Sequence, residues 1–160
     1  MAPLTKTVLL AAAALSGIAN AHFQLQAPPA LTEDSDLQAT GPCGGATLPD
    51  FSSDEGFHDF YAGGDAISHR TSHSQENWLY RVTLDEKAET GWTQLFPVVQ
   101  QNGLGNLCQP RVTVPDEFVG KKGLLSVVGK GHGYLYAVSS PSSPLFPSDG
   151  CCALNCAAAN

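Results

Sequence analysis

Apolar side chains occupy every second position between Trp78 and Leu84, in the segment WLYRVTL. This period of two is typical of a strand with one buried face. Pro and Gly recur along the chain after residue 21, and no long stretch there keeps the 3.6-residue apolar period of a helix. The pattern indicates short strands joined by frequent turns.

Further β-rich segments cover residues 94–100, 111–114, 124–128 and 134–138. Pro97 in the first of them suggests an edge strand or a bulge. Residues 115–118 begin with Pro and acids as a helix does, but Gly120 should stop that helix after about one turn. The predicted fold is all-β, an antiparallel sandwich of immunoglobulin or fibronectin-like type stabilised by disulfides.

The first 21 residues have the features of a secretory signal peptide. Lys6 supplies a basic start, residues 8–15 are apolar, and Ala19-Asn20-Ala21 is a small-residue cleavage site. The apolar run is too short to span a bilayer, and no later segment of about 20 apolar residues follows. We therefore expect a secreted chain without a transmembrane span, whose mature form begins at His22.

The charge of the chain argues against a nucleic-acid partner. It has 15 acidic residues against 8 Lys and Arg, and a formal net charge of −7. Binding to phosphates requires clustered basic side chains. The only adjacent basic pair, Lys121-Lys122, lies in a predicted turn between glycines.

All the cysteines lie after the signal peptide: Cys43, Cys108, Cys151, Cys152 and Cys156. In a secreted chain such residues are expected to form disulfides. Their odd number leaves at least one unpaired or joined to another chain, and the connectivity stays open. A cysteine metal site is less consistent, because two CxxC spacings are not present.

An N-terminal histidine offers two nitrogen donors, its α-amine and its imidazole Nδ1, which close a chelate ring on one ion. The amine has a reference pKa of about 7.7–8.0, so a metal can displace its proton near neutral pH. A second imidazole would complete three nitrogens in a plane, which suits Cu(II). This arrangement is called a histidine brace.

The other histidines are His58, His69, His73 and His132. For each one taken alone, an exposed or hydrogen-bonded side chain is the simpler interpretation. His69 and His73 have the spacing of two zinc ligands on a helix, but their surroundings indicate strand and loop. The glutamate of an HExxH motif is also absent.

Seven segments in order carry a family resemblance: HFQLQAP at 22–28, TGPCGGA at 40–46, AISHRTSH at 66–73, WLYRVTLDEKAETGWTQLFPVVQ at 78–100, GLGNLCQP at 103–110, VPDEFVGKKG at 114–123 and GYLY at 133–136. Through them the chain resembles the fungal LPMO-like copper proteins of the copper acquisition factor (Bim1-like) type. The resemblance implies a copper-binding β-sandwich over residues 22–138. It also implies that His22 and His73 are the brace ligands of Cu(II), whereas His69 falls outside the site.

The resemblance further implies a protein that captures extracellular copper without catalysis. Its partners would be the copper ion and either a membrane copper transporter or the cell wall. Such proteins are secreted, and many are held at the cell surface by a lipid anchor whose hydrophobic signal is absent from the end of this sequence. In such proteins the late cysteine lies on the last strand, which favours pairing of Cys43 with Cys156 over Cys108.

Residues 139–160 depart from the family pattern, as a Ser/Pro-rich and then Cys/Ala-rich tail. We hypothesise that residues 137–155 interrupt the last strand as unspliced intron sequence. In relatives an aspartate follows as a third ligand, but Ala158 takes its place here. Asp59 and Asp65 are possible substitutes, although surface or turn acids are the simpler interpretation.

Two other functions remain open at this point. A lytic polysaccharide monooxygenase uses the same brace to activate oxygen or peroxide, but it needs a broad substrate-facing surface. Trp78, Tyr80 and Trp92 are better interpreted as core residues than as such a surface. A metal-free wall or matrix protein would keep the sandwich only as a scaffold.

Overall fold

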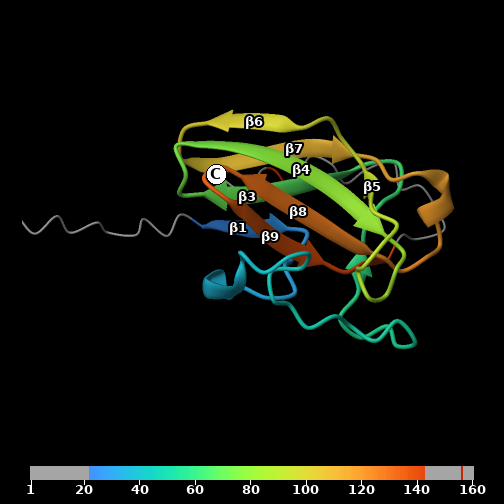
Figure 1. Cartoon of the computed structure of the whole chain (residues 1–160). Coiled ribbons are helices and arrows are strands. Elements are labelled where there is room, and N and C mark those ends of the chain that lie inside the picture. Colours follow the sequence, from blue (N-terminus) through green and yellow to red (C-terminus); the bar gives the residue numbers. More distant parts are fainter. Residues whose placement is uncertain (1–21, 143–155, 157–160) are drawn as a thin grey trace, which may run out of the picture.

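The alternating segment that begins at Trp78 forms the second part of β4, the longest strand of the described chain (Figure 1). The computed structural model describes residues 22–142 and Cys156. Its strands are β1 (Phe23–Ala27), β2 (His58–Asp59), β3 (Asp65–Thr71), β4 (Gln75–Thr83), β5 (Thr93–Gln94), β6 (Val99–Asn102), β7 (Gly105–Val112), β8 (Leu124–Lys130), β9 (Tyr134–Ser139) and β10 (Pro141–Ser142). Two 3₁₀ turns, η1 (Ser35–Leu37) and η2 (Asp116–Phe118), lie between them.

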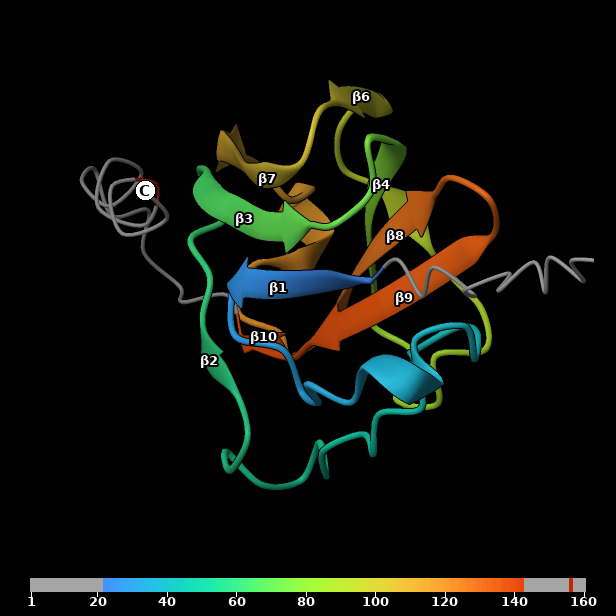
Figure 2. The same cartoon turned by 90° about the vertical axis from the view of Figure 1, so that its left-hand side faces the viewer.

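The strands form two antiparallel sheets that lie against each other (Figure 2). One sheet has the order β1-β3-β7, and the other has the order β5-β4-β8-β9, with β6 also paired to β4. A short parallel pair, β2 with β10, lies beside them. The all-β, mainly antiparallel fold predicted from the sequence is confirmed.

The hydrophobic core lies between the two sheets. Phe23 on β1 and Ile67 on β3 come from the first sheet, while Trp78 on β4 and Val127 on β8 come from the second. The period of two along β4 explains this placement, because Trp78, Tyr80 and Val82 all point to the same buried face. Leu84 lies just beyond the strand and is partly buried against the same core.

The sequence located the central strands better than the outer ones. The strands predicted at 124–128 and 134–138 correspond to β8 and β9, and the single helical turn at 115–118 corresponds to η2. The segment 94–100 is not one strand but contributes to β5 and β6, with Pro97 between them. The strand predicted at 111–114 is β7, which begins earlier, at Gly105, and ends at Val112. The sequence did not indicate its first part, because β7 is a sheet edge whose partly exposed residues show no clear alternation.

The strand pattern continues past residue 138. β9 runs to Ser139, and Pro141–Ser142 form β10 beside His58 and Asp59. Ala137 therefore belongs to a regular strand, and the origin of residues 137–155 as unspliced sequence stays a prediction. The predicted signal peptide at 1–21 lies outside the described residues, as do positions 143–155 and 157–160 of the predicted tail.

The disulfide joins Cys108 on β7 to Cys156. Pairing of Cys43 with Cys156 was therefore the wrong expectation. Cys43 is a free and buried thiol that packs in a small apolar cluster with Ala88, Leu124 and Val138. Burial raises the pKa of this thiol, against a smaller opposing effect of Arg81. The buried neighbours of Cys43 thus include the apolar side chain of Val138 on β9 and no bonded sulfur.

Candidate metal site at the start of β1

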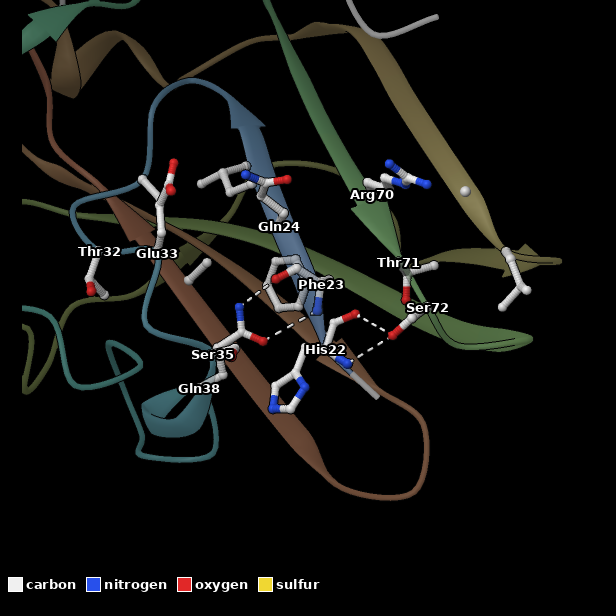
Figure 3. Close-up of a pocket in the computed structure, with 15 residues that line it drawn as sticks. His22, Phe23, Gln24, Thr32, Glu33, Ser35, Gln38, Arg70, Thr71 and Ser72 are labelled. Atoms are coloured by element: carbon white, nitrogen blue, oxygen red, sulfur yellow. Dashed lines mark hydrogen bonds between the residues drawn. The ribbon is translucent and has the colours of Figure 1, made fainter. Parts of the chain in front are cut away.

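The main chain at the start of β1 is held by two polar side chains (Figure 3). The side-chain oxygen of Gln38 accepts a hydrogen bond from Phe23 N at 3.3 Å, and its amide nitrogen donates to Phe23 O. Gln38 is itself buried. This bidentate clamp positions β1 from the side opposite to its pairing with β3.

Ser72 fixes the residue before Phe23. Its hydroxyl accepts from His22 N at 3.1 Å and donates to His22 O at 3.0 Å, while Ser72 N donates to the same oxygen at 3.1 Å. The strand register places Phe23 opposite Thr71, so His22 lies opposite Ser72. The backbone nitrogen of His22 is therefore held beside the residue that directly precedes His73.

His73 is buried in the turn from β3 to β4, with 9% of its surface exposed. Its Nδ1 lies 2.6 Å from Oε2 of Glu76, a side chain that is only 1% exposed. Its Nε2 is buried and has no hydrogen-bond partner among the described residues. A buried ring nitrogen without a partner costs free energy, and a metal ion would supply that partner.

Glu76 is an unusual residue for the inside of a sheet. Burial raises the pKa of its carboxyl, whereas the neighbouring His73 and His132 lower it. The two effects have different causes, because burial disfavours the charged carboxylate whereas an adjacent positive charge favours it. The site thus combines a buried acid with nearby imidazoles.

Three chain segments converge at this end of the sandwich, on the left-hand side of Figure 1. They are the start of β1, the turn between β3 and β4, and the hairpin between β8 and β9. Each carries one histidine: His22, His73 and His132, respectively. The rings of His73 and His132 have their centroids 6.3 Å apart.

Two surface hollows flank this convergence. One of about 670 Å³ is lined by His22, Gln38, Ser72 and neighbouring residues (Figure 3). The other, of about 590 Å³, is lined by Ser72, His73, His132 and neighbouring residues. Ser72 borders both hollows, so His22 and His73 line adjacent openings.

The remaining histidines lie elsewhere. His69 on β3 is completely buried, contacts the Trp78 ring at 4.0 Å between centroids and lies 3.0 Å from Tyr80 Oη. Burial lowers its pKa to about 3. His58 on β2 pairs with β10, which follows the far end of β9. Burial lowers the pKa of His58, with Asp65 and Asp59 acting in the opposite direction.

The two acids considered as substitutes for a third ligand are not at this end of the molecule. Asp59 lies on β2 beside His58, and Asp65 begins β3, six positions before Thr71 reaches the start of β1. The Asp65 carboxylate accepts from Ala66 N at 2.7 Å, as expected for a residue that shapes a turn. Neither carboxylate approaches His73.

Within the described residues, no group of three or more His, Cys, Asp or Glu side chains is arranged to hold a metal. A side-chain-only centre of the zinc type is therefore not formed there. A histidine brace differs from such a side-chain centre, because one of its three nitrogen donors belongs to the main chain. The partnerless Nε2 of His73 and the pinned nitrogen of His22 fit that donor set.

Sequence reasoning overlooked the residues that support the site. Gln38, Ser72 and Glu76 carry no motif, and each acts only after the chain has folded. The sequence contained one indication of Glu76, because this residue continues the alternation of Trp78, Tyr80 and Val82 and so belongs to the buried face of β4. An acid on the buried face of a predicted strand needs a partner, and that need points to a site.

The chain matches the model of one protein family, described as copper acquisition factor BIM1-like, over residues 20–157. The comparison with curated proteins finds no match. Among the described residues, no helix is long and apolar enough to cross a membrane.

Proposed function

Because the chain belongs to the BIM1-like copper acquisition factor family, we propose that it captures extracellular Cu(II) through a histidine brace, for uptake or buffering. The ion is cargo in this proposal, and the protein is not an enzyme. Cleavage after Ala21 would convert the peptide nitrogen of His22 into a free amine. The donors are then this amine, Nδ1 of His22 and Nε2 of His73.

One observation carries the proposal, the hydrogen bonding between His22 and Ser72. It holds the backbone nitrogen of His22 next to the residue that precedes His73. The residues that supply the donors, His22 and His73, thus lie just outside the paired ends of β1 and β3 before any metal arrives. Such preorganisation lowers the entropy lost on binding.

The choice of copper follows from the chemistry of the donors. Three nitrogens in one plane suit the tetragonal preference of Cu(II), which also binds such sites more tightly than other first-row divalent ions do. The α-amine has a low reference pKa of about 7.7–8.0 and loses its proton to a metal near neutral pH. A lysine amine in the same place would compete less well.

The aromatic residues support binding without polysaccharide oxidation. Trp78 and Tyr80 are completely buried in the core. Trp92 is partly buried, its indole nitrogen donates to Ala88 O, and the Arg81 guanidinium lies 4.3 Å from its ring centroid. These three rings therefore offer no flat surface for a polysaccharide chain.

A copper titration of two matched forms tests the proposal. One form begins at His22 and the other carries one extra residue before it, which converts the amine into an amide. We expect tight binding with nitrogen hyperfine structure in the EPR spectrum of the first form, and at least about 100-fold weaker binding by the second. His73→Ala should weaken binding similarly, whereas His58→Ala, at the other end of the fold, should leave it unchanged.

Equal binding by both forms would refute the brace. The monooxygenase alternative is tested separately, by incubating the copper-loaded protein with chitin or cellulose and a reductant. We expect no oxidised oligosaccharides. Their release, lost in the His73→Ala variant, would assign catalysis to the same site.

A further inference from the structure

We propose that Glu76 is a positioning residue of the metal site. Its carboxylate accepts a hydrogen bond from Nδ1–H of His73, which leaves the lone pair of Nε2 to bind the ion. This inference rests on the proposed copper function and adds a residue to it. Glu76 does not touch the ion in this arrangement. It acts through the imidazole of His73.

The contact between the two side chains is short and enclosed. Glu76 Oε2 lies 2.6 Å from His73 Nδ1, and the two side chains are 1% and 8% exposed. Both carboxylate oxygens are buried, and neither makes an aligned hydrogen bond with a described residue. The 2.6 Å approach of Oε2 to His73 Nδ1 is therefore an ion-pair contact, which places a dehydrated carboxylate directly against the imidazole.

The neighbouring strand is shaped to admit this pair. A Cβ on Gly129 of β8 would lie 3.0 Å from Glu76 Oε1 and 2.8 Å from the Trp78 ring. A Cβ on Gly131, just after β8, would lie 2.7 Å from His73 Nδ1 and 2.9 Å from Glu76 Oε2. Any larger residue at these two positions would push the acid and the imidazole apart.

The position of the proton decides what His73 can do. A neutral imidazole has one N–H donor and one acceptor nitrogen. With the proton on Nδ1 facing Glu76, the lone pair lies on Nε2, the nitrogen that is buried without a partner. A carboxylate that accepts from the outer nitrogen of a ligating histidine also increases the basicity of that ligand.

The negative charge of Glu76 has a second effect. The proposed donors of the brace are all neutral, so the bound ion would keep its full charge of +2. A buried carboxylate one ring away offsets part of that charge.

The test compares Glu76→Leu and Glu76→Gln with wild type in the full chain beginning at His22. Leucine removes the acceptor, whereas glutamine keeps a carbonyl acceptor without the charge. Glu86→Gln, at an exposed position in the turn after β4, is the matched control. Circular dichroism and thermal unfolding without metal establish that each variant is folded.

The first readout needs no copper. Nitrogen-15 NMR of the histidine rings, recorded well above the reference His pKa of about 6.5, reports which nitrogen of His73 carries the proton. We expect the Nδ1–H tautomer in wild type, Glu76→Gln and Glu86→Gln, and a shift toward Nε2–H in Glu76→Leu. An Nε2–H tautomer in wild type, or no change in Glu76→Leu, overturns the inference.

The second readout is copper binding and its EPR spectrum. We expect affinity to fall about 10–100-fold in Glu76→Leu, the range found for outer-shell partners of metal ligands, and less in Glu76→Gln. If wild type binds copper through His73 while Glu76→Leu keeps its affinity and spectrum, the inference fails and the copper function stands. If wild type shows no binding that depends on His22 and His73, the proposed function itself fails.

Discussion

The hydroxyl of Ser72 contacts both main-chain polar groups of His22, with Oγ 3.1 Å from the nitrogen and 3.0 Å from the oxygen. The residues are 50 positions apart in sequence and meet because β1 pairs with β3. A single hydroxyl thus sets the orientation of the first residue of the proposed mature chain. Its removal is the most direct perturbation of that geometry.

Ser72→Ala should weaken copper binding without abolishing it. The loss of one hydrogen bond costs about 0.5–1.5 kcal/mol, which corresponds to about 2–10-fold in affinity. Competition with a copper chelator measures this change. Ser52→Ala, whose hydroxyl bonds Asp50 in an exposed turn, is the control and should leave the affinity unchanged. Wild-type affinity in Ser72→Ala would show that this hydroxyl does not position the donor.

Gln38→Ala should also weaken binding, because the Gln38 amide holds Phe23 from the other side of β1. The truncation leaves two main-chain groups of Phe23 without their buried partner, so stability should fall by about 1–3 kcal/mol. Urea unfolding without copper measures the stability, and a chelator competition measures the affinity. A variant that loses neither would mean that β1 is held by its pairing with β3 alone.

Acid should destabilise the fold partly through His69. Its folded pKa is lowered to about 3 by burial, whereas the unfolded value is about 6.5. Between these values the unfolded chain binds a proton that the native state does not, so this contribution to stability falls as the pH decreases from about 6.5 to about 3. Below about 3 both states are protonated and the effect levels off.

His69→Gln removes this titration and keeps an amide within reach of Tyr80. We expect its unfolding free energy to decrease less than that of wild type between about pH 6.5 and 4, and the two curves to run parallel above about pH 7. Urea unfolding at a series of pH values provides the comparison. Parallel curves through the acid range would show that His69 becomes protonated in the folded protein.

Opening the disulfide should destabilise the protein. Cys108 and Cys156 are 48 positions apart, and a crosslink of this span typically contributes about 2–4 kcal/mol. Cys108→Ser should therefore unfold at lower urea than wild type. A reductant should shift wild type toward the variant and leave the variant itself almost unchanged, which separates the loss of the crosslink from local damage at Cys108.

The free thiol of Cys43 should stay unreactive in the folded protein. It is buried, and its raised pKa disfavours the reactive thiolate. Alkylation followed by peptide mapping should leave Cys43 unlabelled in native buffer and label it in urea. A non-reduced map that joined Cys43 to another cysteine would contradict the connectivity found here.

The inner strands could be predicted from the sequence because their buried side chains produce a regular alternation of apolar residues. Trp78, Tyr80 and Val82 alternate along β4, and they pack against Phe23 and Ile67 of the other sheet. β7 shows no such alternation, because it lies at the edge of its sheet and most of its residues are only partly buried or exposed. Its strand character comes from hydrogen bonding to β3, which local patterns do not report.

The cysteines show the same division. Their number and secreted context predicted a disulfide, and one is present. Which pair forms depends on which strands are neighbours, and Cys43 packs in an apolar cluster with Val138 instead of against a sulfur partner. The pairing of Cys43 with Cys156 was implied by the resemblance alone, whereas the fold joins Cys156 to Cys108 on β7.

For the site, the sequence by itself identified the kind of donor. A predicted cleavage site before His22 and the resemblance around His73 lead to the prediction of two nitrogen ligands, because both are local features that can be recognised without the fold. The tertiary structure alone decided what surrounds those ligands. Strand pairing brought Ser72 to His22, and the turn between β3 and β4 placed Glu76 against His73. Glycines at the end of β8 and just after it leave room for the acid and the imidazole. Such contacts depend on strands distant in sequence lying side by side, and only folding brings them together.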